Sequence, residues 1–333
     1  MKDTLKILGI FAILTMMIPM LSFFSPKNEE TVSESPAADI TEEADIPAID
    51  ADGMFRVLDC TTGQVTEMTM TEYVVGAVLG EMPASFHDEA IKAQAVAAHT
   101  YAVRRMLQQQ DSPDPQLKGA YISNDSTKYQ AYFSPEQAAY FYGDAYEAHN
   151  SRITALAEEV INELIVFNGE PIIAAFHSSS GAMTESAENI WGSEIPYLVP
   201  VENSENAVPA DTIFTAAELE ARFSQKYGTV FPEDLSEWFR INSVSPSGTV
   251  LSFSAGDTIL TGTEVRTLLN LRSACFTAEL SDDGGSFIFS VKGSGHGVGL
   301  SQHGANAMAE NGADYKQILA HYYKGAEIIS FGS

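Results

Sequence analysis

One glutamate, Glu81, lies in the segment Gly80-Glu81-Met82-Pro83, where an apolar stretch of sequence ends at a proline. A carboxyl group that leans on hydrophobic neighbours is harder to ionise, so its pKa rises above the usual value. With a pKa of about 4.3, only roughly 0.2% of such groups are protonated at pH 7, whereas with a pKa of about 6 roughly a tenth are. Glu81 is therefore a candidate general acid, although its position alone is more typical of a solvated glutamate near a helix end.

A histidine and three hydroxyls lie together in the segment His177-Ser178-Ser179-Ser180-Gly181. An imidazole and hydroxyls in a cleft are suited to hydrogen bonding with the hydroxyls of a sugar. A serine–histidine hydrolase is one alternative, but the nucleophile elbow Gly-x-Ser-x-Gly is absent from this segment. A turn of small polar residues without a chemical role is the other alternative.

Glycine occupies every second position from Gly293 to Gly299, around His296, and Ser301-Gln302-His303-Gly304 follows. Glycine lets the backbone bend sharply or approach a ligand closely. The spacing differs from the dinucleotide-binding pattern, and the Gly-Lys pair of a phosphate-binding loop is missing. A metal held by His177, His296 and His303 is conceivable, but no closely spaced pair of ligands supports it, and no metal is expected.

The elements that must position these segments alternate irregularly between strands and helices, which predicts an α+β fold. The helix after Glu81 is rich in alanine, so neighbouring backbones can approach it closely and it is expected to be central. Asn168-Gly169 between apolar runs predicts a hairpin over 165–176, whose second strand leads into His177. Capping patterns begin helices at Ser134 and Thr215. The predicted strands are 54–60, 65–70, 250–253, 276–280 and 287–291. The other predicted helices are 71–82, 88–110, 301–311 and 314–323, and Thr71 is the predicted N-terminal cap of the first of these.

The N-terminal region is typical of a membrane anchor. Residues 7–24 carry no charge over 18 positions, which is at the lower limit for crossing a bilayer. Lysines precede this run and glutamates follow it, so the positive-inside rule places the body of the protein outside the cytoplasm. A cleaved signal peptide and a buried core helix are the alternatives, but no small-x-small cleavage site follows the run. The predicted organisation is a cytoplasmic N-terminus (1–4), a transmembrane anchor (5–24), an acidic flexible linker (25–52) and an extracytoplasmic body (53–333).

The 333 residues include 45 acidic and 18 basic side chains, which gives a formal net charge of −27. This excess argues against nucleic acid as a partner, because neutralising phosphates requires clustered lysines and arginines. Only nine of the acidic residues lie in 25–52, so the body is itself acidic. Two cysteines, Cys60 and Cys275, are too few for a four-thiolate metal site or a disulfide framework.

Several motifs follow one another along the chain from Glu72 to Gln302. They are Glu72-Tyr73-Val74-Val75-Gly76 with Gly80-Glu81-Met82-Pro83, Glu89 to Tyr101, His177 to Gly181, Trp191 with Pro196-Tyr197-Leu198, and Gly295 to Gln302. In this order they resemble the signature of the stage II sporulation protein D family, which also includes the amidase-enhancer proteins. The resemblance extends over about residues 54–325.

This resemblance implies a lytic transglycosylase that cleaves peptidoglycan during engulfment in sporulation. Sporulation members cleave between N-acetylmuramic acid and N-acetylglucosamine and prefer strands without stem peptides. Glu81 occupies the position of the catalytic acid. Most glycosidases need two carboxylates, but here the muramic acid 6-hydroxyl can attack its own C1 and leave a 1,6-anhydro product. Glu81 would protonate the leaving oxygen and then accept the hydroxyl proton.

The resemblance also implies a set of substrate-binding residues and no cofactor. Lys92 would bind the sugar or its lactyl carboxylate, or would orient Glu81. Because an acidic body gives an anionic glycan no long-range attraction, affinity must come from local contacts, with Lys92 as the leading cation and Arg104 and Arg105 as helpers. The residues expected to bind substrate are Lys92, His99, His177, Ser178, Ser180, Tyr197, His296 and Gln302.

The chain departs from the family pattern at three places. The family usually has Arg where this chain has His99, so that polar contact is expected to depend on pH around a histidine pKa of about 6.5. Ser294 and His303 replace common aromatic residues. Some members bind zinc through Cys and His before the Gln-Ala-Tyr segment, but residues 117–132 contain neither, so no metal is expected.

The partners implied by the resemblance are peptidoglycan glycan strands, the engulfment amidase stage II sporulation protein P, and the membrane protein stage II sporulation protein M. The implied location is the cell membrane, with a single pass and a cytoplasmic N-terminus. The alternative function is a non-catalytic glycan-binding enhancer of a peptidoglycan amidase.

Overall fold

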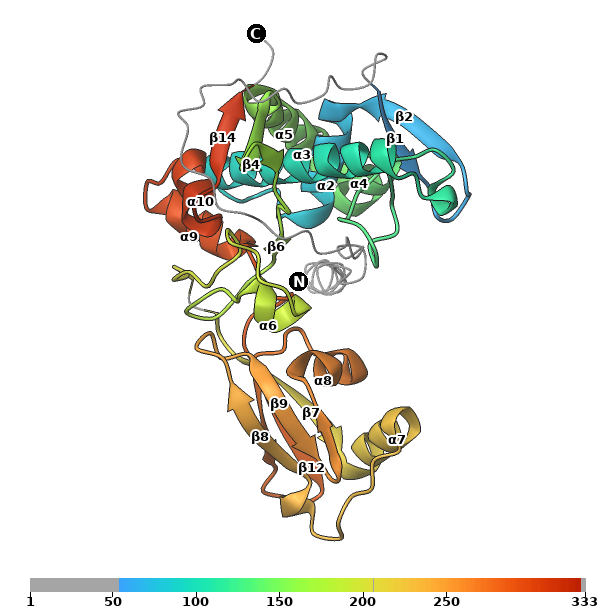
Figure 1. Cartoon of the computed structure of the whole chain (residues 1–333), viewed down its shortest axis with the longest axis vertical. Coiled ribbons are helices and arrows are strands. Elements are labelled where there is room, and N and C mark those ends of the chain that lie inside the picture. The colour runs from blue at the N-terminus through green and yellow to red at the C-terminus, as the bar shows by residue number, and fades with distance from the viewer. Residues whose placement is uncertain (1–53, 206, 331–333) are drawn as a thin grey trace, which may run out of the picture.

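The computed structural model describes residues 54–205 and 207–330. They form two lobes, each built around its own hydrophobic core (Figure 1). The main lobe consists of residues 54–205 and 293–330, and the inserted lobe consists of residues 210–292. The predicted body 53–333 therefore contains two cores, because the chain leaves the main lobe after Glu205 and returns to it through the glycine-rich loop.

Two helices form the centre of the main lobe, α2 (Met70–Glu81) and α3 (Asp88–Asp111). The alanines of α3 are buried, as expected for a central helix whose small side chains let neighbours approach from several sides. The predicted cap of the first helix was wrong by two residues. Thr69 caps α2, because its side chain accepts from the Glu72 N–H while the Glu72 carboxylate accepts from the Thr69 N–H, a reciprocal pair that Thr71 cannot form.

Small sheets and further helices surround this pair of helices. One sheet has the order β2-β1-β3 and another has the order β14-β4-β5, while β6 and β13 form a two-stranded parallel pair. The strands are β1 (Met54–Leu58), β2 (Val65–Thr69), β3 (Ile122–Ser123), β4 (Glu163–Phe167), β5 (Glu170–Pro171), β6 (Phe176–His177), β13 (Leu300–Ser301) and β14 (Glu327–Ser330). The helices are α4 (Pro135–Tyr142), α5 (Tyr146–Val160), α6 (Ala187–Trp191), α9 (Gln302–Glu310) and α10 (Tyr315–Tyr322), with 3-10 turns at Pro115–Leu117 and Gly143–Ala145.

The predicted hairpin forms, but it does not lead directly into His177. Asn168 and Gly169 adopt positive φ angles of 52° and 80° and connect β4 to β5. The second strand then ends at Pro171, and the Ala175 N–H donates back to the Ile173 carbonyl at 2.8 Å, which breaks the extended run. His177 therefore lies on a separate strand, β6, which pairs with β13 instead of with the hairpin.

The inserted lobe packs two three-stranded sheets around an aromatic core, with the orders β10-β9-β8 and β11-β12-β7. The capping box at Thr215 begins α7, as the sequence predicts, and Gly228, with a φ of 72°, ends it. Its elements are β7 (Ala210–Thr215), α7 (Ala216–Tyr227), β8 (Phe239–Val244), β9 (Val250–Ala255), β10 (Thr258–Leu260), α8 (Gly262–Leu269), β11 (Phe276–Leu280) and β12 (Ser286–Val291), with a 3-10 turn at Leu235–Glu237.

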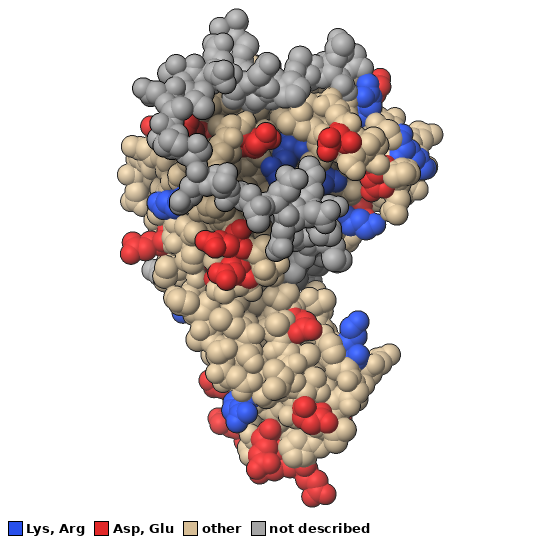
Figure 2. Space-filling model, viewed as in Figure 1, with Lys and Arg blue, Asp and Glu red and all other residues tan. Residues whose placement is uncertain are grey.

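The mixture of helices and small sheets confirms the predicted α+β class. The predicted anchor (5–24) and linker (25–52) lie outside the described residues. Within 54–205 and 207–330, no helix has both the length and the apolar character that a bilayer crossing requires. Acidic side chains are spread over the visible faces of both lobes (Figure 2).

Candidate active site

Glu81 is the last residue of α2 and is only 2% exposed. Its burial depends on two glycines of the same helix, since residues 130–133 cross α2 at Gly76 and Gly80. A Cβ at position 76 would lie 2.4 Å from the Tyr132 ring and 2.6 Å from the Phe133 carbonyl oxygen. With glycine there, the Phe133 N–H donates to the Gly76 carbonyl at 3.0 Å. The same segment brings the Ala131 N–H to 2.5 Å from Oε1 of Glu81.

Burial raises the pKa of Glu81 to about 8, and the hydrogen bond from the Ala131 N–H offsets only part of this effect. The position at the carboxyl end of a helix works in the same direction, because the exposed carbonyls there carry partial negative charge. With such a pKa, roughly nine in ten of these groups are protonated at pH 7. Glu81 thus has the protonation state that a general acid needs, although its position alone is more typical of a solvated glutamate.

Aromatic hydroxyls lie near this carboxyl. Burial raises the pKa of Tyr73 and of Tyr101, and the negative charge of an ionised Glu81 adds to both effects. The side-chain amide of Gln130 donates to the Tyr73 hydroxyl at 2.5 Å, while its Oε1 has no hydrogen-bond partner among the described residues. Both tyrosines stay protonated at neutral pH, so Glu81 is the group in this cluster that can exchange a proton.

The serine-rich and glycine-rich segments lie against each other. His177 and Ser301 are paired in the parallel β6–β13 ladder, and Ser179 and Ser294 exchange backbone hydrogen bonds of 3.0 and 2.8 Å. The glycines permit this packing, because Gly295 has a φ of 106° and a Cβ there would lie 2.7 Å from the His177 Cβ. The glycine loop therefore serves the contact between two protein segments.

His177 and His296 are buried and neutral, whereas His303 is exposed. Nδ1 of His177 lies 3.2 Å from the Val298 carbonyl, and Nδ1 of His296 accepts from the Val298 N–H at 3.0 Å. Burial lowers the pKa of His177 to about 4 and the pKa of His296 well below its usual value. The His177 and His296 ring centroids are 5.8 Å apart, while His303 packs edge-on against Phe86 at 5.0 Å. Among the residues that the structure describes, no group of three His, Cys, Asp or Glu side chains could hold a metal ion.

Helix α9, which follows the glycine-rich segment, contacts both the loop after Glu81 and α3. The contact of Phe86 with His303 joins the loop after Glu81 to α9, and the His87 N–H donates to Asn306 Oδ1 at 2.8 Å. Gln302 Nε2 lies 3.4 Å from Gln94 Oε1, and the other amide atom of Gln94, Nε2, is buried without a hydrogen-bond partner in the described part of the chain.

Two predicted substrate-binding residues on α3 have protein partners. Lys92 forms an ion pair with Glu159 at 2.7 Å, which connects α3 to α5, and another with Glu89 of its own helix at 3.2 Å. Nδ1 of His99 lies 3.0 Å from the Glu163 carbonyl, and burial lowers the pKa of His99 to about 4. The pH dependence expected around 6.5 for the His99 contact therefore moves to about 4, because the imidazole is buried.

The remaining predicted residues also hold the protein framework together. The Ile173 N–H donates to the Tyr197 hydroxyl at 2.9 Å. The Ser178 carbonyl accepts from the His303 N–H at 3.0 Å, and the Ser180 hydroxyl accepts from Asn203 Nδ2 at 2.9 Å. Contacts of these residues with substrate stay predictions.

Two carboxylates that the sequence did not indicate lie beside these segments. Glu205 accepts from the Ser180 N–H and from the Ser301 hydroxyl, and burial raises its pKa to about 7. Glu185 is 1% exposed and accepts the hydroxyl of Ser245 in the inserted lobe at 2.5 Å. Neither glutamate has a spacing pattern that would have revealed it, because Ser301, the partner of Glu205, and Ser245, the partner of Glu185, come from distant parts of the chain.

Comparison with known proteins shows consistent similarity. The family model described as "Stage II sporulation protein" matches residues 59–167. The chain is 36% identical over 268 residues to Stage II sporulation protein D of Bacillus subtilis (strain 168), covering 79% of this chain and 75% of that protein. It is 35% identical over 264 residues to Stage II sporulation protein D of Bacillus amyloliquefaciens, with the same coverage. It is 26% identical over 309 residues to the Amidase enhancer of Bacillus subtilis, covering 77% of this chain and 40% of that protein.

Proposed function

Because the chain belongs to the stage II sporulation protein D family, we propose that it is a lytic transglycosylase that cleaves peptidoglycan glycan strands during engulfment. The observation that carries this proposal is the state of Glu81, a buried carboxyl at the end of α2 whose pKa is raised to about 8. A carboxylic acid that keeps its proton at neutral pH can donate it to the oxygen of a breaking glycosidic bond.

The proposed reaction needs one such group. Oε1 of Glu81 accepts the Ala131 N–H, so Oε2 carries the proton that goes to the oxygen between N-acetylmuramic acid and N-acetylglucosamine. The bond from that oxygen to C1 of muramic acid breaks, and the 6-hydroxyl oxygen of the same sugar bonds to C1. The carboxylate then takes the proton of that hydroxyl, which restores Glu81 and yields a 1,6-anhydro sugar. Water is not activated, so a second carboxylate at the spacing of ordinary glycosidases is unnecessary.

Mass spectrometry of the products tests this assignment. The full chain is incubated with glycan strands free of stem peptides, and 1,6-anhydromuramoyl ends are counted for the wild type, Glu81→Gln and Glu158→Gln. Glu158 is an exposed glutamate on α5 and serves as the matched control. We expect the anhydro product from the wild type and from Glu158→Gln, and little from Glu81→Gln. Equal yields from all three proteins would show that Glu81 is not the acid.

A second candidate function is a non-catalytic enhancer of a peptidoglycan amidase. The similarity to the Amidase enhancer of Bacillus subtilis supports it, as does His99 at the position where the family usually has Arg. Under this function no anhydro product forms, and the chain raises the rate at which an amidase removes stem peptides, equally with Glu81 or with Gln at position 81.

The proposed setting follows from the same family membership. The anchor expected at 5–24 would hold the body at the outer side of the cell membrane, with the N-terminus in the cytoplasm. The proposed partners are stage II sporulation protein P, an amidase that would supply peptide-free strands, and the membrane protein stage II sporulation protein M. Co-purification of each protein with the full chain from membranes tests this setting, and failure of both to co-purify would count against it.

A further inference from the structure

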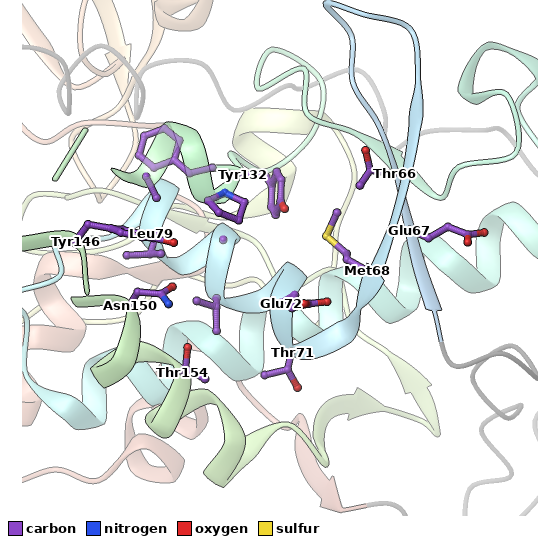
Figure 3. A pocket seen from close by; sticks show the side chains of 15 residues that line it. Thr66, Glu67, Met68, Thr71, Glu72, Leu79, Tyr132, Tyr146, Asn150 and Thr154 are labelled. Atoms are coloured by element: carbon purple, nitrogen blue, oxygen red, sulfur yellow. The ribbon is translucent and has the colours of Figure 1, made fainter. Parts of the chain in front are cut away.

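A cavity of about 400 Å³ lies beside α2 (Figure 3). Its walls come from β2, α2, α5 and the start of α4. Leu79 lines this cavity, and successive residues of an α-helix are rotated by about 100°, so the side chain of Glu81 leaves α2 on the other side. The cavity is therefore distinct from the surroundings of the proposed catalytic carboxyl.

The cavity combines an apolar floor with a polar rim. Met68, Val75 and Leu79 are buried and form part of the floor. The rim carries hydroxyl and amide groups and two tyrosine rings, which belong to Thr66, Thr71, Asn150, Thr154, Tyr132 and Tyr146. Apolar walls with a few convergent polar groups are typical of sites for small molecules, and the volume lies within their usual range.

The aromatic ring of Tyr132 in the cavity wall is held in place by a second, buried aromatic ring. The ring of Tyr132 stacks on the buried ring of Tyr73, with centroids 5.6 Å apart and an angle of 11° between the planes. Gly76 leaves the room that this ring occupies. A fixed aromatic plane is a suitable surface for the C–H groups of a sugar ring, because it needs no rearrangement on binding.

The charge of the cavity restricts its ligand. Glu72 contributes a carboxylate close to Tyr132, and no Lys, Arg or His is among the described residues that line the cavity. Glu67 lies on the opposite face of β2 from Met68, so its carboxylate points away from the cavity (Figure 3) and pairs with Arg56 at 3.1 Å. An anionic ligand would meet the negative charge of Glu72 with no cation in the lining, so the cavity favours an uncharged ligand over an anion.

We propose that this cavity is a second glycan site, which takes an uncharged N-acetylhexosamine such as N-acetylglucosamine. The inference rests on the proposed function, which brings the protein to strands that alternate an uncharged sugar with one that carries a lactyl carboxylate. The acetamido methyl packs on the floor at Met68 and Leu79, and sugar hydroxyls bond to Asn150 and Thr154 on α5. The cavity rejects N-acetylmuramic acid because of the negative charge of Glu72, so it selects every second sugar of a strand.

Methyl NMR of the full chain tests this site separately from the catalytic one. Met68 lines the cavity, while Met82 follows Glu81 directly, so the two methyl groups report on two different places. Met68→Leu and Met82→Leu identify the two signals among the 11 methionines. Chitotriose, a chain of three N-acetylglucosamines, is titrated into the Glu81→Gln chain, and N-acetylmuramic acid is titrated in parallel.

We expect chitotriose to shift the Met68 signal in a saturable way and N-acetylmuramic acid to leave it unchanged. Asn150→Ala and Thr154→Ala should each weaken chitotriose binding at Met68 about fivefold, the loss expected for one hydrogen bond. Ser151→Ala, an exposed neighbour on α5, should leave it unchanged. If chitotriose shifts the Met82 signal and leaves the Met68 signal unchanged, this proposal is overturned while the proposed function stays intact. A Met68 signal that responds to a lysine-rich peptide and not to the sugar overturns it as well.

Discussion

The backbone N–H of Ala131 donates to Oε1 of Glu81 at 2.5 Å, and this bond joins the end of α2 to a segment that follows fifty residues later. The segment lies against α2 because Gly76 and Gly80 leave room for it. One peptide group thus holds a carboxyl in place without supplying the positive charge that would ionise it. The geometry combines a fixed orientation with a raised pKa, and both are needed for a general acid.

The rate of glycan cleavage should depend on the protonation of Glu81. Because the active form is the protonated acid and its pKa is raised to about 8, activity should hold on the acidic side of this value. It should fall about tenfold for each pH unit above it. Initial rates of anhydro product formation between pH 6 and 10 measure this decrease in the cleavage rate. A rate that rises through pH 8 would assign the carboxylate, not the acid, to the rate-limiting step.

Replacing Glu81 by Gln should make the stability of the protein less dependent on pH. Between 4.5, its ordinary value, and about 8, the folded protein keeps a proton on Glu81 that the unfolded chain has lost. The stabilisation that comes from this proton is therefore complete below pH 4.5. It is lost as the pH rises from 4.5 to about 8, by at most about 1.4 kcal/mol per pH unit. Urea unfolding of both proteins at pH 5 and pH 8 gives the difference. An equal loss in the wild type and in Glu81→Gln would contradict the raised pKa.

Gly76→Ala should destabilise the main lobe and reduce activity together. The added methyl group would lie 2.4 Å from the Tyr132 ring and 2.6 Å from a backbone oxygen, so the segment that holds Glu81 has to move. Overpacking of this kind costs about 1–3 kcal/mol. Gly285→Ala is the matched control, because it is exposed in the inserted lobe and the Cβ that it would add meets only Asp283 Oδ1 at 3.9 Å. Unfolding curves and product yields of the two variants should differ, and a Gly76→Ala protein as active as wild type would show that this crossing does not position the acid.

Glu185→Ala should loosen the attachment of the inserted lobe. Its carboxylate accepts from the Ser186 N–H, Asn189 and the Ser245 hydroxyl, and truncation leaves the buried Ser245 hydroxyl without this acceptor. A buried donor left in this way costs about 1–3 kcal/mol. Small-angle scattering should show a wider distribution of lobe positions, and Glu188→Ala, an exposed glutamate on α6, should not change it. Scattering curves identical to wild type would mean that the other contacts between the lobes, such as Ser247 with the Thr184 carbonyl, suffice.

Local patterns in the sequence were reliable where the interaction is local. The capping boxes at Ser134 and Thr215 and the Asn168-Gly169 turn occur where they were predicted, since their partners lie within three or four residues. The cap of α2 was placed two residues late, because Thr69 and Thr71 are both suitable caps and only Glu72 decides between them. The strand that carries His177 was assigned to the hairpin, since nothing nearby in sequence indicates that β13, more than a hundred residues later, is its partner.

The sequence by itself determined the family, the α+β class and the candidate acid Glu81, because these depend on residue types in a fixed order. Tertiary structure decided the environment of that acid, since its burial and the Ala131 N–H come from residues 130–133. It also decided that the chain builds two cores, that Lys92 pairs with Glu89 and Glu159, and that Glu185 joins the lobes. Those facts depend on contacts between residues far apart in the chain, and a pKa or an ion pair depends on what surrounds a group in space.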